Sequence, residues 1–337
     1  MDSENIKLKT TLNMDRKEFL ATIAAIGGAA LVPKASASVL RDVADRVEAE
    51  QGQRRVNPSK TILMGDIHIS GDFNDEGKPK HYPYNPICFE QQAREILAMR
   101  ELPANLIILG DVAWDHGLEE DYRYAAELFK PLQQAGIRIT MAMGNHDRRA
   151  PFFSVFEDHL KQTRVAGRVV SVVELPEVDF VVLDSLDELP NLKRGESTNV
   201  DGEMDQAQID WLTGYLATAK RPVILGAHHP LNEMPNLEAV IAKSDAAVGY
   251  IYAHLHIWNK GVRIIRPKDP KRMVPAVCLP STFYGDIGYA VMHTSKDKAE
   301  IEYSSNGFWW PQPVENPPKE WAQRQQDLAA ERCTILF

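Results

Sequence analysis

From residue 60 onward, short apolar runs alternate with longer stretches in which apolar residues recur every three or four positions. The first pattern predicts buried strands, and the second predicts amphipathic helices. The strands expected before residue 260 are Thr61–Met64, Leu106–Leu109, Ile137–Met143, Phe180–Leu183, Val223–Leu225 and Ala247–Tyr252. The helices expected between them are Ile87–Arg100, Glu119–Gln134, Pro151–Gln162 and Asp205–Ala219. This alternation predicts an α/β fold in which helices cover a sheet.

After residue 260 the pattern changes to short strands with no helix between them. The strands expected there are Val262–Ile265, Val274–Leu279, Tyr289–His293 and Ala299–Tyr303. Such a β-rich end favours mixed sheets or a two-sheet sandwich. Prolines then precede a helical pattern at Glu320–Arg332, so residues 308–337 are expected to form a C-terminal extension.

The first forty residues have the parts of an export signal. Arg16-Lys17 precedes an uncharged apolar run, Phe19–Val32, and Ala35-Ser36-Ala37 follows it. This run is shorter than the ~20 residues that span a bilayer as a helix. The sequence around Arg16-Lys17 resembles a twin-arginine signal with lysine in the second position. We therefore expect residues 1–37 to be a cleaved signal peptide, with an amphipathic N-terminal helix or an uncleaved anchor as the alternatives, and either Met1 or Met14 as the start.

Charge and cysteine content narrow the class of protein. The 337 residues carry a formal net charge of −9, which argues against a general binder of nucleic acid or anionic membranes. Three scattered cysteines provide no disulfide framework and no zinc knuckle. We expect an exported protein, periplasmic or secreted, with no stable membrane anchor after signal cleavage.

Polar and charged residues follow five of the predicted strands, at the point where each strand ends. In open α/β sheets, ligand sites form at the carboxyl ends of the strands. Each of these motifs alone is more often a turn, a helix cap or a packed histidine, but together they hold six of the ten histidines, which indicates one site. The motifs are Gly65-Asp66-Ile67-His68, Gly110-Asp111, Gly144-Asn145-His146-Asp147, His228-His229 and His254-Leu255-His256.

The side chains in these motifs indicate a metal class. Imidazole, carboxylate and amide donors without a thiolate suit Mn, Fe, Zn or Ni better than Ca or Mg. Two carboxylates, one amide and four imidazoles exceed the needs of one ion, so we expect two divalent transition-metal ions sharing one carboxylate. Such ions would allow an acidic protein to bind a phosphate ester.

These motifs resemble those of the calcineurin-like metallophosphoesterase superfamily in their order and spacing. The resemblance covers roughly residues 60 to 260. Weaker similarities are Leu183-Asp184-Ser185 and Gly202 with Gln208-x-x-Trp211-Leu212. The resemblance implies a two-sheet β-sandwich flanked by helices, in four α/β/β/α layers. It places the metallophosphoesterase domain at residues 59–307, after a lead-in at residues 38–58.

The resemblance also implies roles for individual residues. Asp111 would bridge two metals; the other ligands would be Asp66, His68 and His256 for the first, and Asn145, His228 and His254 for the second. His146 would donate to the phosphoryl or leaving oxygen, with Asp147 holding it in orientation. His228 is preferred over His229 because the family's ligand stands two residues before a proline, here Pro230.

The chain also departs from parts of the family pattern. Ala253 stands where the last motif usually has glycine, which predicts a tighter backbone there. Purple acid phosphatases lack the first histidine and carry a tyrosine ligand after Gly-Asp, whereas this chain has His68 and Val112-Ala113-Trp114. Asp115-His116-Gly117 stands one residue late for the Asp-Arg-Gly of the Ser/Thr protein phosphatases and lacks its arginine. The phosphodiesterase-type branch is favoured.

The function expected is hydrolysis of a small phosphate ester, a phosphodiester in preference to a monoester, by a metal-bridging hydroxide. The alternatives are a catalytically idle metal-binding module and an exported phosphomonoesterase or nuclease of the same fold. No nucleic-acid partner is expected, and the oligomeric state is open. Candidate substrate contacts are His116, His81 and Tyr82.

Overall fold

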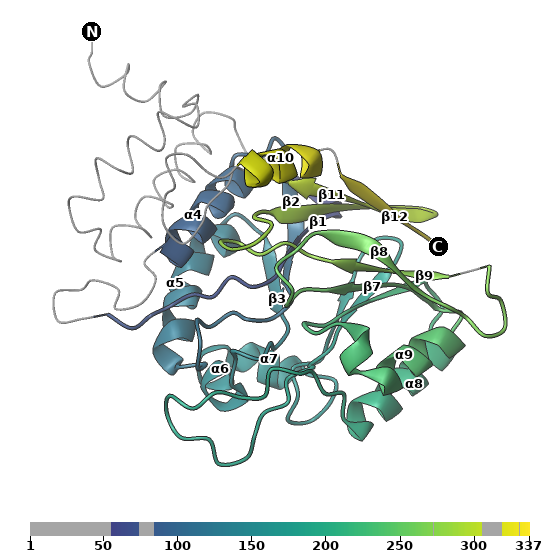
Figure 1. Ribbon diagram of the computed structural model, residues 1–337, viewed down its shortest axis with the longest axis horizontal. Helices are drawn as coiled ribbons and strands as arrows, with labels where there is room; N and C mark the ends of the chain where they lie inside the picture. Colours follow the sequence, from purple (N-terminus) through teal and green to yellow (C-terminus); the bar gives the residue numbers. More distant parts are fainter. Residues whose placement is uncertain (1–54, 74–83, 272, 305–318, 330) are drawn as a thin grey trace, which may run out of the picture.

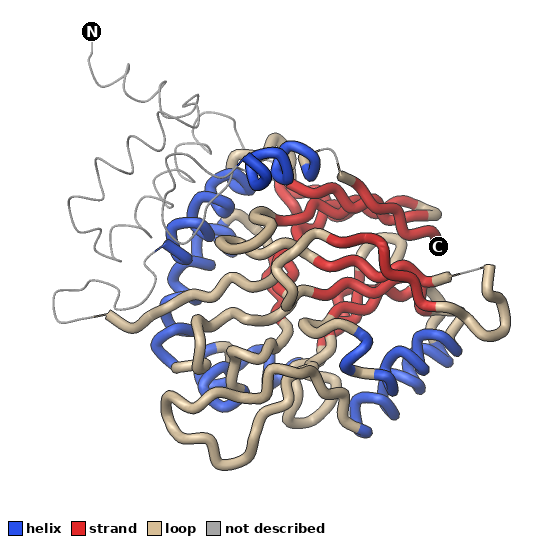
Figure 2. The backbone as a smooth tube through the Cα atoms, in the orientation of Figure 1, coloured by secondary structure: helices blue, strands red, loops and turns tan. Residues whose placement is uncertain are grey.

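The computed structural model describes residues 55–73, 84–271, 273–304, 319–329 and 331–337, and in it two six-stranded sheets lie face to face with helices outside them (Figures 1 and 2). The first sheet has the order β12 (Arg332–Leu336), β11 (Lys298–Ser304), β10 (Tyr289–Ser295), β1 (Val56–Met64), β2 (Leu102–Ile108) and β3 (Arg138–Met141). The second has the order β4 (Ser171–Glu174), β5 (Asp179–Val182), β6 (Val223–Gly226), β7 (Ala247–Tyr252), β9 (Val274–Cys278) and β8 (Asn259–Ile264).

Both sheets are mixed, and each has a parallel centre. Strands β1, β2 and β3 run parallel, while β10, β11 and β12 add to β1 in antiparallel steps. In the second sheet β5, β6, β7 and β9 run parallel, and β4 and β8 are antiparallel edge strands. The carboxyl ends of the parallel strands in each sheet therefore point the same way.

Alternation along the strands explains the layers, because successive side chains point to opposite faces of a sheet. On β1, Ile62 and Met64 pack with the helices, whereas Leu63 packs between the sheets. On β5, Phe180 faces the sandwich interior and Val181 faces outward. The covering helices are α4 (Tyr84–Leu97), α5 (Glu119–Gln134) and α6 (Arg149–Val155) on the first sheet, and α8 (Gln206–Thr218) and α9 (Pro235–Lys243) on the second. Helix α7 (Glu157–Gln162) follows α6 and contacts it through the rings of His159 and Phe152. The expected two-sheet fold with flanking helices is confirmed.

Some elements differ from the sequence expectation. The helix expected over Pro151–Gln162 is two helices, because Phe156 between them has a non-helical backbone with φ −109° and ψ 58°. Strand β4 and helix α9, which follows a short 3-10 turn at Leu231–Glu233, were not predicted. Each is short, and α9 buries only Leu237 and Ile241.

The C-terminal residues contribute to the first sheet. Helix α10 (Lys319–Leu328) ends earlier than the predicted Glu320–Arg332, and β12 follows it and pairs with β11. Cys333 and Ile335 are buried between the sheets, and their exposed neighbours alternate with them as a half-buried edge strand requires. Strand β12 was not predicted from the sequence. Part of the segment expected as a C-terminal extension therefore belongs to the sandwich.

At the other end, β1 begins at Val56, inside the expected lead-in. The expected signal peptide, residues 1–37, lies outside the described residues, as do His81 and Tyr82. None of the helices in the described ranges has the length and apolar character that a membrane span requires.

Candidate metal centre

The five predicted motifs meet at one end of the sandwich, where loops from both sheets bond to one another. The loops after β1 and β2 run side by side, since the backbone N–H groups of Asp66 and His68 donate to Gly110 and Asp111 carbonyls at 3.1 and 2.9 Å. The loop after β7 joins the end of β6 through Ala253, whose N–H donates to the His228 carbonyl at 2.9 Å. The His254 N–H donates to the Asp66 carboxylate at 3.1 Å and links the two sheets.

One group of donor atoms comprises Asp66, His68 and His256, whose ligand atoms all lie within 4.8 Å of one another. The Asp66 Oδ1 atom is 3.2 Å from His256 Nε2 and 3.9 Å from His68 Nε2. Asp66 and His68 are buried, and the side chain of His256 is 18% exposed. These residues are the ones expected for the first metal.

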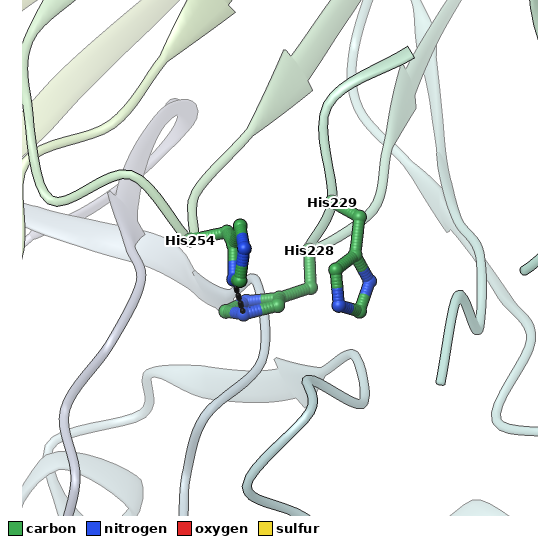
Figure 3. A group of neighbouring side chains, drawn as sticks. All are labelled: His228, His229 and His254. Atoms are coloured by element: carbon green, nitrogen blue, oxygen red, sulfur yellow. Dashed lines mark hydrogen bonds between the residues drawn. The ribbon is translucent and has the colours of Figure 1, made fainter. Parts of the chain in front are cut away.

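A second group lies beside it. Asn145 Oδ1 is 3.2 Å from His228 Nε2 and 3.0 Å from His254 Nδ1, and these two ring nitrogens are 3.3 Å apart (Figure 3). Asp111 lies between the groups, because its Oδ2 atom is 3.3 Å from His228 Nε2 and 3.6 Å from His68 Nε2. The structure thus brings together every residue expected as a metal ligand, with Asp111 between the two groups.

The hydrogen bonds of two histidines show that these groups fit divalent cations. His228 Nδ1 lies 2.8 Å from the Leu109 carbonyl, and His68 Nδ1 lies 3.0 Å from the Trp114 carbonyl. A carbonyl only accepts, so each Nδ1 carries the proton, and in the neutral ring each Nε2 directs a lone pair at Asp111. A lone pair facing a carboxylate requires a cation between them, either a proton or a metal. This second-partner arrangement is typical of metal-ligating histidines.

For His68, His254 and Asp111, electrostatics at the centre favour the protonation state that binds metal. Burial lowers the pKa of His68 and of His254 to about 4, which keeps both rings neutral. Burial alone would raise the pKa of Asp111, but His228 and His68 hold it well below its usual value. The pKa of His228 rises to about 9 against the effect of its burial, because Asp111 and Asp66 stabilise the protonated ring. A bound proton there takes the place that a metal ion would fill.

Backbone strain is concentrated at the same residues. In the described part of the chain, six non-glycine residues have positive φ, and five of them are expected ligands. The left-handed region costs an L-residue about 1–2 kcal/mol. Strain of this kind persists where the surrounding structure enforces it and is common at functional sites. These five residues are Asp66 (φ 53°), His68 (44°), Asp111 (50°), His254 (68°) and His256 (53°).

Two glycines allow the loops to approach closely. A Cβ atom on Gly144 would lie 2.2 Å from Asp111 Oδ1, so only glycine leaves room for the Asp111 carboxylate. A Cβ on Gly65 would lie 2.4 Å from the Ala253 methyl group. The alanine in the position where the family pattern has glycine is therefore accommodated because its neighbour, Gly65, has no side chain.

His146 borders the centre, but its partner differs from the expected one. The rings of His146 and His68 have centroids 5.0 Å apart. His146 Nδ1 lies 3.2 Å from Asp115 Oδ1 and 3.1 Å from the Asp115 carbonyl, so Asp115 orients the ring. Asp147 was expected in this role, and that expectation is wrong, because the ring nitrogen bonds to Asp115. In the sequence, Asp115 stood out only as the first residue of Asp115-His116-Gly117, and nothing there linked it to His146.

The buried carboxylate of Asp147 ties together the loops that carry the ligands. It accepts hydrogen bonds from the backbone N–H groups of Val112, Ala113 and Gly144 at 3.2, 3.0 and 2.9 Å. The Tyr122 hydroxyl donates to it as well, at 3.0 Å. These four donors occupy both oxygens of Asp147, so its contribution is to the shape of the site.

Other candidate residues lie around the centre. His116 Nε2 is 2.9 Å from Asp115 Oδ2, so His116 lies at the rim beside His146. His229 belongs to the same imidazole group as His228 and His254 (Figure 3), but its Nδ1 bonds to Ser185 Oγ at 2.8 Å. This geometry agrees with the preference for His228 as the ligand that faces Asp111.

The weaker sequence similarities are structural. The Gln208 side chain exchanges hydrogen bonds with the backbone of Asp184 at 2.8 and 3.1 Å. Gly202 packs on the His229 ring, where a Cβ would lie 2.5 Å from the side chain. These residues fix the strand ends that carry Ser185 and the two adjacent histidines.

Comparison with known families agrees with the presence of candidate metal-binding groups. The family model described as calcineurin-like phosphoesterase matches residues 59–258. This chain belongs to the calcineurin-like phosphoesterase family. The family points to metal-dependent hydrolysis of phosphate esters, and the aspartate and histidine groups of this chain are candidate sites for the divalent metals.

Solved structures of low sequence identity resemble the chain. A predicted phosphoesterase from Streptococcus pneumoniae is 13% identical, with a TM-score of 0.33, over 75% of this chain and 93% of that one. TT1561 of Thermus thermophilus is 11% identical, with a TM-score of 0.43, over 73% and 98%. A single mutant of Vps29 from Entamoeba histolytica is 8% identical, with a TM-score of 0.33, over 82% and 99%. A comparison with curated proteins gave no match.

Proposed function

We propose that this protein hydrolyses a phosphate ester, and a phosphodiester in preference to a monoester, at a site for two divalent transition-metal ions. The observation that carries the proposal is the place of Asp111. Its Oδ2 atom lies 3.6 Å from His68 Nε2 of one donor group and 3.3 Å from His228 Nε2 of the other. A carboxylate between two donor sets is what a pair of ions with a shared ligand requires.

Each group of residues has a chemical task in this proposal. Asp66, His68 and His256 hold the first ion, and Asn145, His228 and His254 hold the second. When bound, the two ions acidify a shared water and neutralise charge on the phosphoryl oxygens.

His146 donates a proton or a hydrogen bond to the leaving oxygen, a contribution of about 10²–10⁴ in rate. Its side chain is 34% exposed at the edge of the centre, where a substrate can reach it.

The arginines next to the site support the preference for a diester. A monoester dianion is commonly bound by bidentate arginines. Here the Arg149 guanidinium is paired with Asp184 and Glu188, and Arg148 donates to the Lys193 carbonyl. Because these two side chains are held by the protein, a singly charged diester, whose remaining charge the metals neutralise, suits the site better.

The test is a comparison of esters and metals on the purified full-length protein. Hydrolysis of bis-p-nitrophenyl phosphate and of p-nitrophenyl phosphate is measured with Mn²⁺, Zn²⁺, Ni²⁺ and Fe²⁺, and again after chelation. We expect metal-dependent turnover with the diester faster than the monoester. Faster monoester turnover would overturn the diester preference, and metal binding without hydrolysis of either ester would support a binding module instead.

We also propose that the protein is exported and acts on a small ester outside the cytoplasm. The support is the basic pair, the apolar run and the small residues before residue 38. Expression of the full chain followed by N-terminal sequencing of the periplasmic fraction tests this. A mature N-terminus near Ser38 is expected, and an intact chain retained in the cytoplasm would contradict it.

A further inference from the structure

The loop between β9 and β10 supports the backbone around His256. The Asp286 N–H donates to the His256 carbonyl at 2.8 Å, and Asp286 Oδ2 accepts from the Trp258 N–H at 2.7 Å. One residue thus bonds to the chain at His256 and again two residues later. The Asp286 side chain is only 8% exposed, so these bonds are shielded from water.

The backbone at His256 needs such support. His256 has a φ of 53°, a left-handed conformation that an L-residue adopts at a cost of about 1–2 kcal/mol. Its neighbours Leu255 and Ile257 are exposed, at 44% and 39%, and so bury little surface that would hold the loop. Gly285 allows the close approach, since a Cβ there would lie 2.1 Å from the His256 carbonyl oxygen.

Helix α10 reaches this loop through Arg324. The Arg324 Nε and Nη2 atoms donate to the two oxygens of Asp286 at 3.1 and 2.8 Å, and Nη2 also donates to the Trp258 carbonyl at 3.1 Å. The guanidinium therefore binds both Asp286 and the backbone that Asp286 holds. A bidentate pair of this kind is stronger and more directional than a single ion pair.

We propose that Arg324 and Asp286 are positioning residues for His256, so that the C-terminal helix α10 completes the first metal site. Neither side chain touches the metal donors, and both act through the His256–Trp258 backbone. The inference rests on the proposed function, because it takes His256 as a ligand of the first ion. Residues that orient a ligand from behind typically change metal affinity 10- to 100-fold when they are replaced.

The test is a calorimetric titration of the full chain with Mn²⁺, comparing Arg324→Gln with Arg332→Gln. Arg332 on β12 is a matched control, since it forms one exposed ion pair with Glu302 on the neighbouring strand β11. We expect Arg324→Gln to lower the affinity for one of the two Mn²⁺ ions about tenfold and to leave the affinity for the other within twofold of the wild type. Excess Mn²⁺ should restore kcat, which a general loss of folding would not allow.

A conservative variant distinguishes a loss of positioning from misfolding. Arg324→Lys keeps the charge but loses the bidentate geometry, so its affinity for the weaker ion should lie between the wild type and Arg324→Gln. Two affinities in Arg324→Gln equal to those of Arg332→Gln would overturn the inference. Selective weakening of one ion in a chain whose wild type hydrolyses no ester would support this inference while overturning the proposed function.

Discussion

The ring of His146 is held by Asp115, whose Oδ1 atom lies 3.2 Å from His146 Nδ1. The same carboxylate is 2.9 Å from His116 Nε2, so two imidazoles share one acid at the rim of the metal centre. A ring whose Nδ1–H is bonded to Asp115 presents Nε2 to the substrate, and the orientation of the proposed donor therefore depends on Asp115.

Replacing Asp115 should impair the chemical step more than binding. We expect Asp115→Asn to lower kcat about tenfold with a smaller change in KM, because a neutral amide oxygen is a weaker acceptor for the His146 ring N–H than the carboxylate is. Two metal ions per chain should remain. Steady-state kinetics and metal analysis of the same preparation check this. Asp210→Asn, on the exposed face of α8 beside Gln206, is the control and should match the wild type.

Asp147 should matter for stability. Asp147→Asn places an amide among four donors, and we expect the free energy of unfolding to fall by about 2–4 kcal/mol, since buried donors lose their acceptor. His146→Ala, at a part-exposed position, should lower stability by less than about 1 kcal/mol. Urea denaturation of the two variants distinguishes them. Equal stability losses would show that the network around Asp147 is not what joins the loops.

Gly144 should tolerate no side chain. Gly144→Ala directs a methyl group at the Asp111 carboxylate, where a Cβ would lie 2.2 Å from Oδ1. We expect at least about tenfold weaker metal binding and a stability loss of about 1–3 kcal/mol. Gly214→Ala is the control, because a Cβ there meets nothing within 4 Å and the residue lies inside α8. That variant should be slightly more stable, and similar metal binding in both would refute the steric account.

The pH dependence of stability should contain a contribution from Glu95 on α4. Burial raises the pKa of Glu95 from 4.5 to about 7. Between these values the folded chain holds a proton that the unfolded chain releases, so stability falls as pH rises through this window.

Glu95→Gln stays neutral at every pH. Its stability relative to wild type should therefore grow from near zero at pH 4 to about 1–3 kcal/mol at pH 8. Urea unfolding of both proteins at a series of pH values measures this difference. A difference in the free energy of unfolding that does not change with pH would contradict the raised pKa of Glu95.

Much of the metal centre could be predicted from the chain because strand ends are marked locally. Leu106–Leu109 is apolar and Gly110-Asp111 is not, and the carboxyl ends of parallel strands meet in space. Helix α5 has the predicted bounds because its apolar spacing is regular and acidic residues begin it. These patterns depend only on residues that are close together in the sequence.

Other features depend on the folded backbone. Asp147 follows His146 directly in the sequence, yet the chain turns so that Asp147 bonds to the β2 loop while Asp115 reaches the ring. The positive φ of Asp111, which redirects that loop, leaves no trace in a pattern of apolar and polar positions. The role of Arg324 was equally hidden, because its partner Asp286 lies 38 residues away on a loop between strands.

The most direct test of the central claim is the metal content of Asp111→Asn. Because Asp111 lies between the two donor groups, its loss should affect both ions, whereas loss of His256 should affect one. Metal analysis after equilibration with Mn²⁺ should give two ions per chain for the wild type, about one for His256→Ala, and less than one for Asp111→Asn. Two ions bound to Asp111→Asn, with diester hydrolysis unchanged, would contradict the shared site and the mechanism built on it.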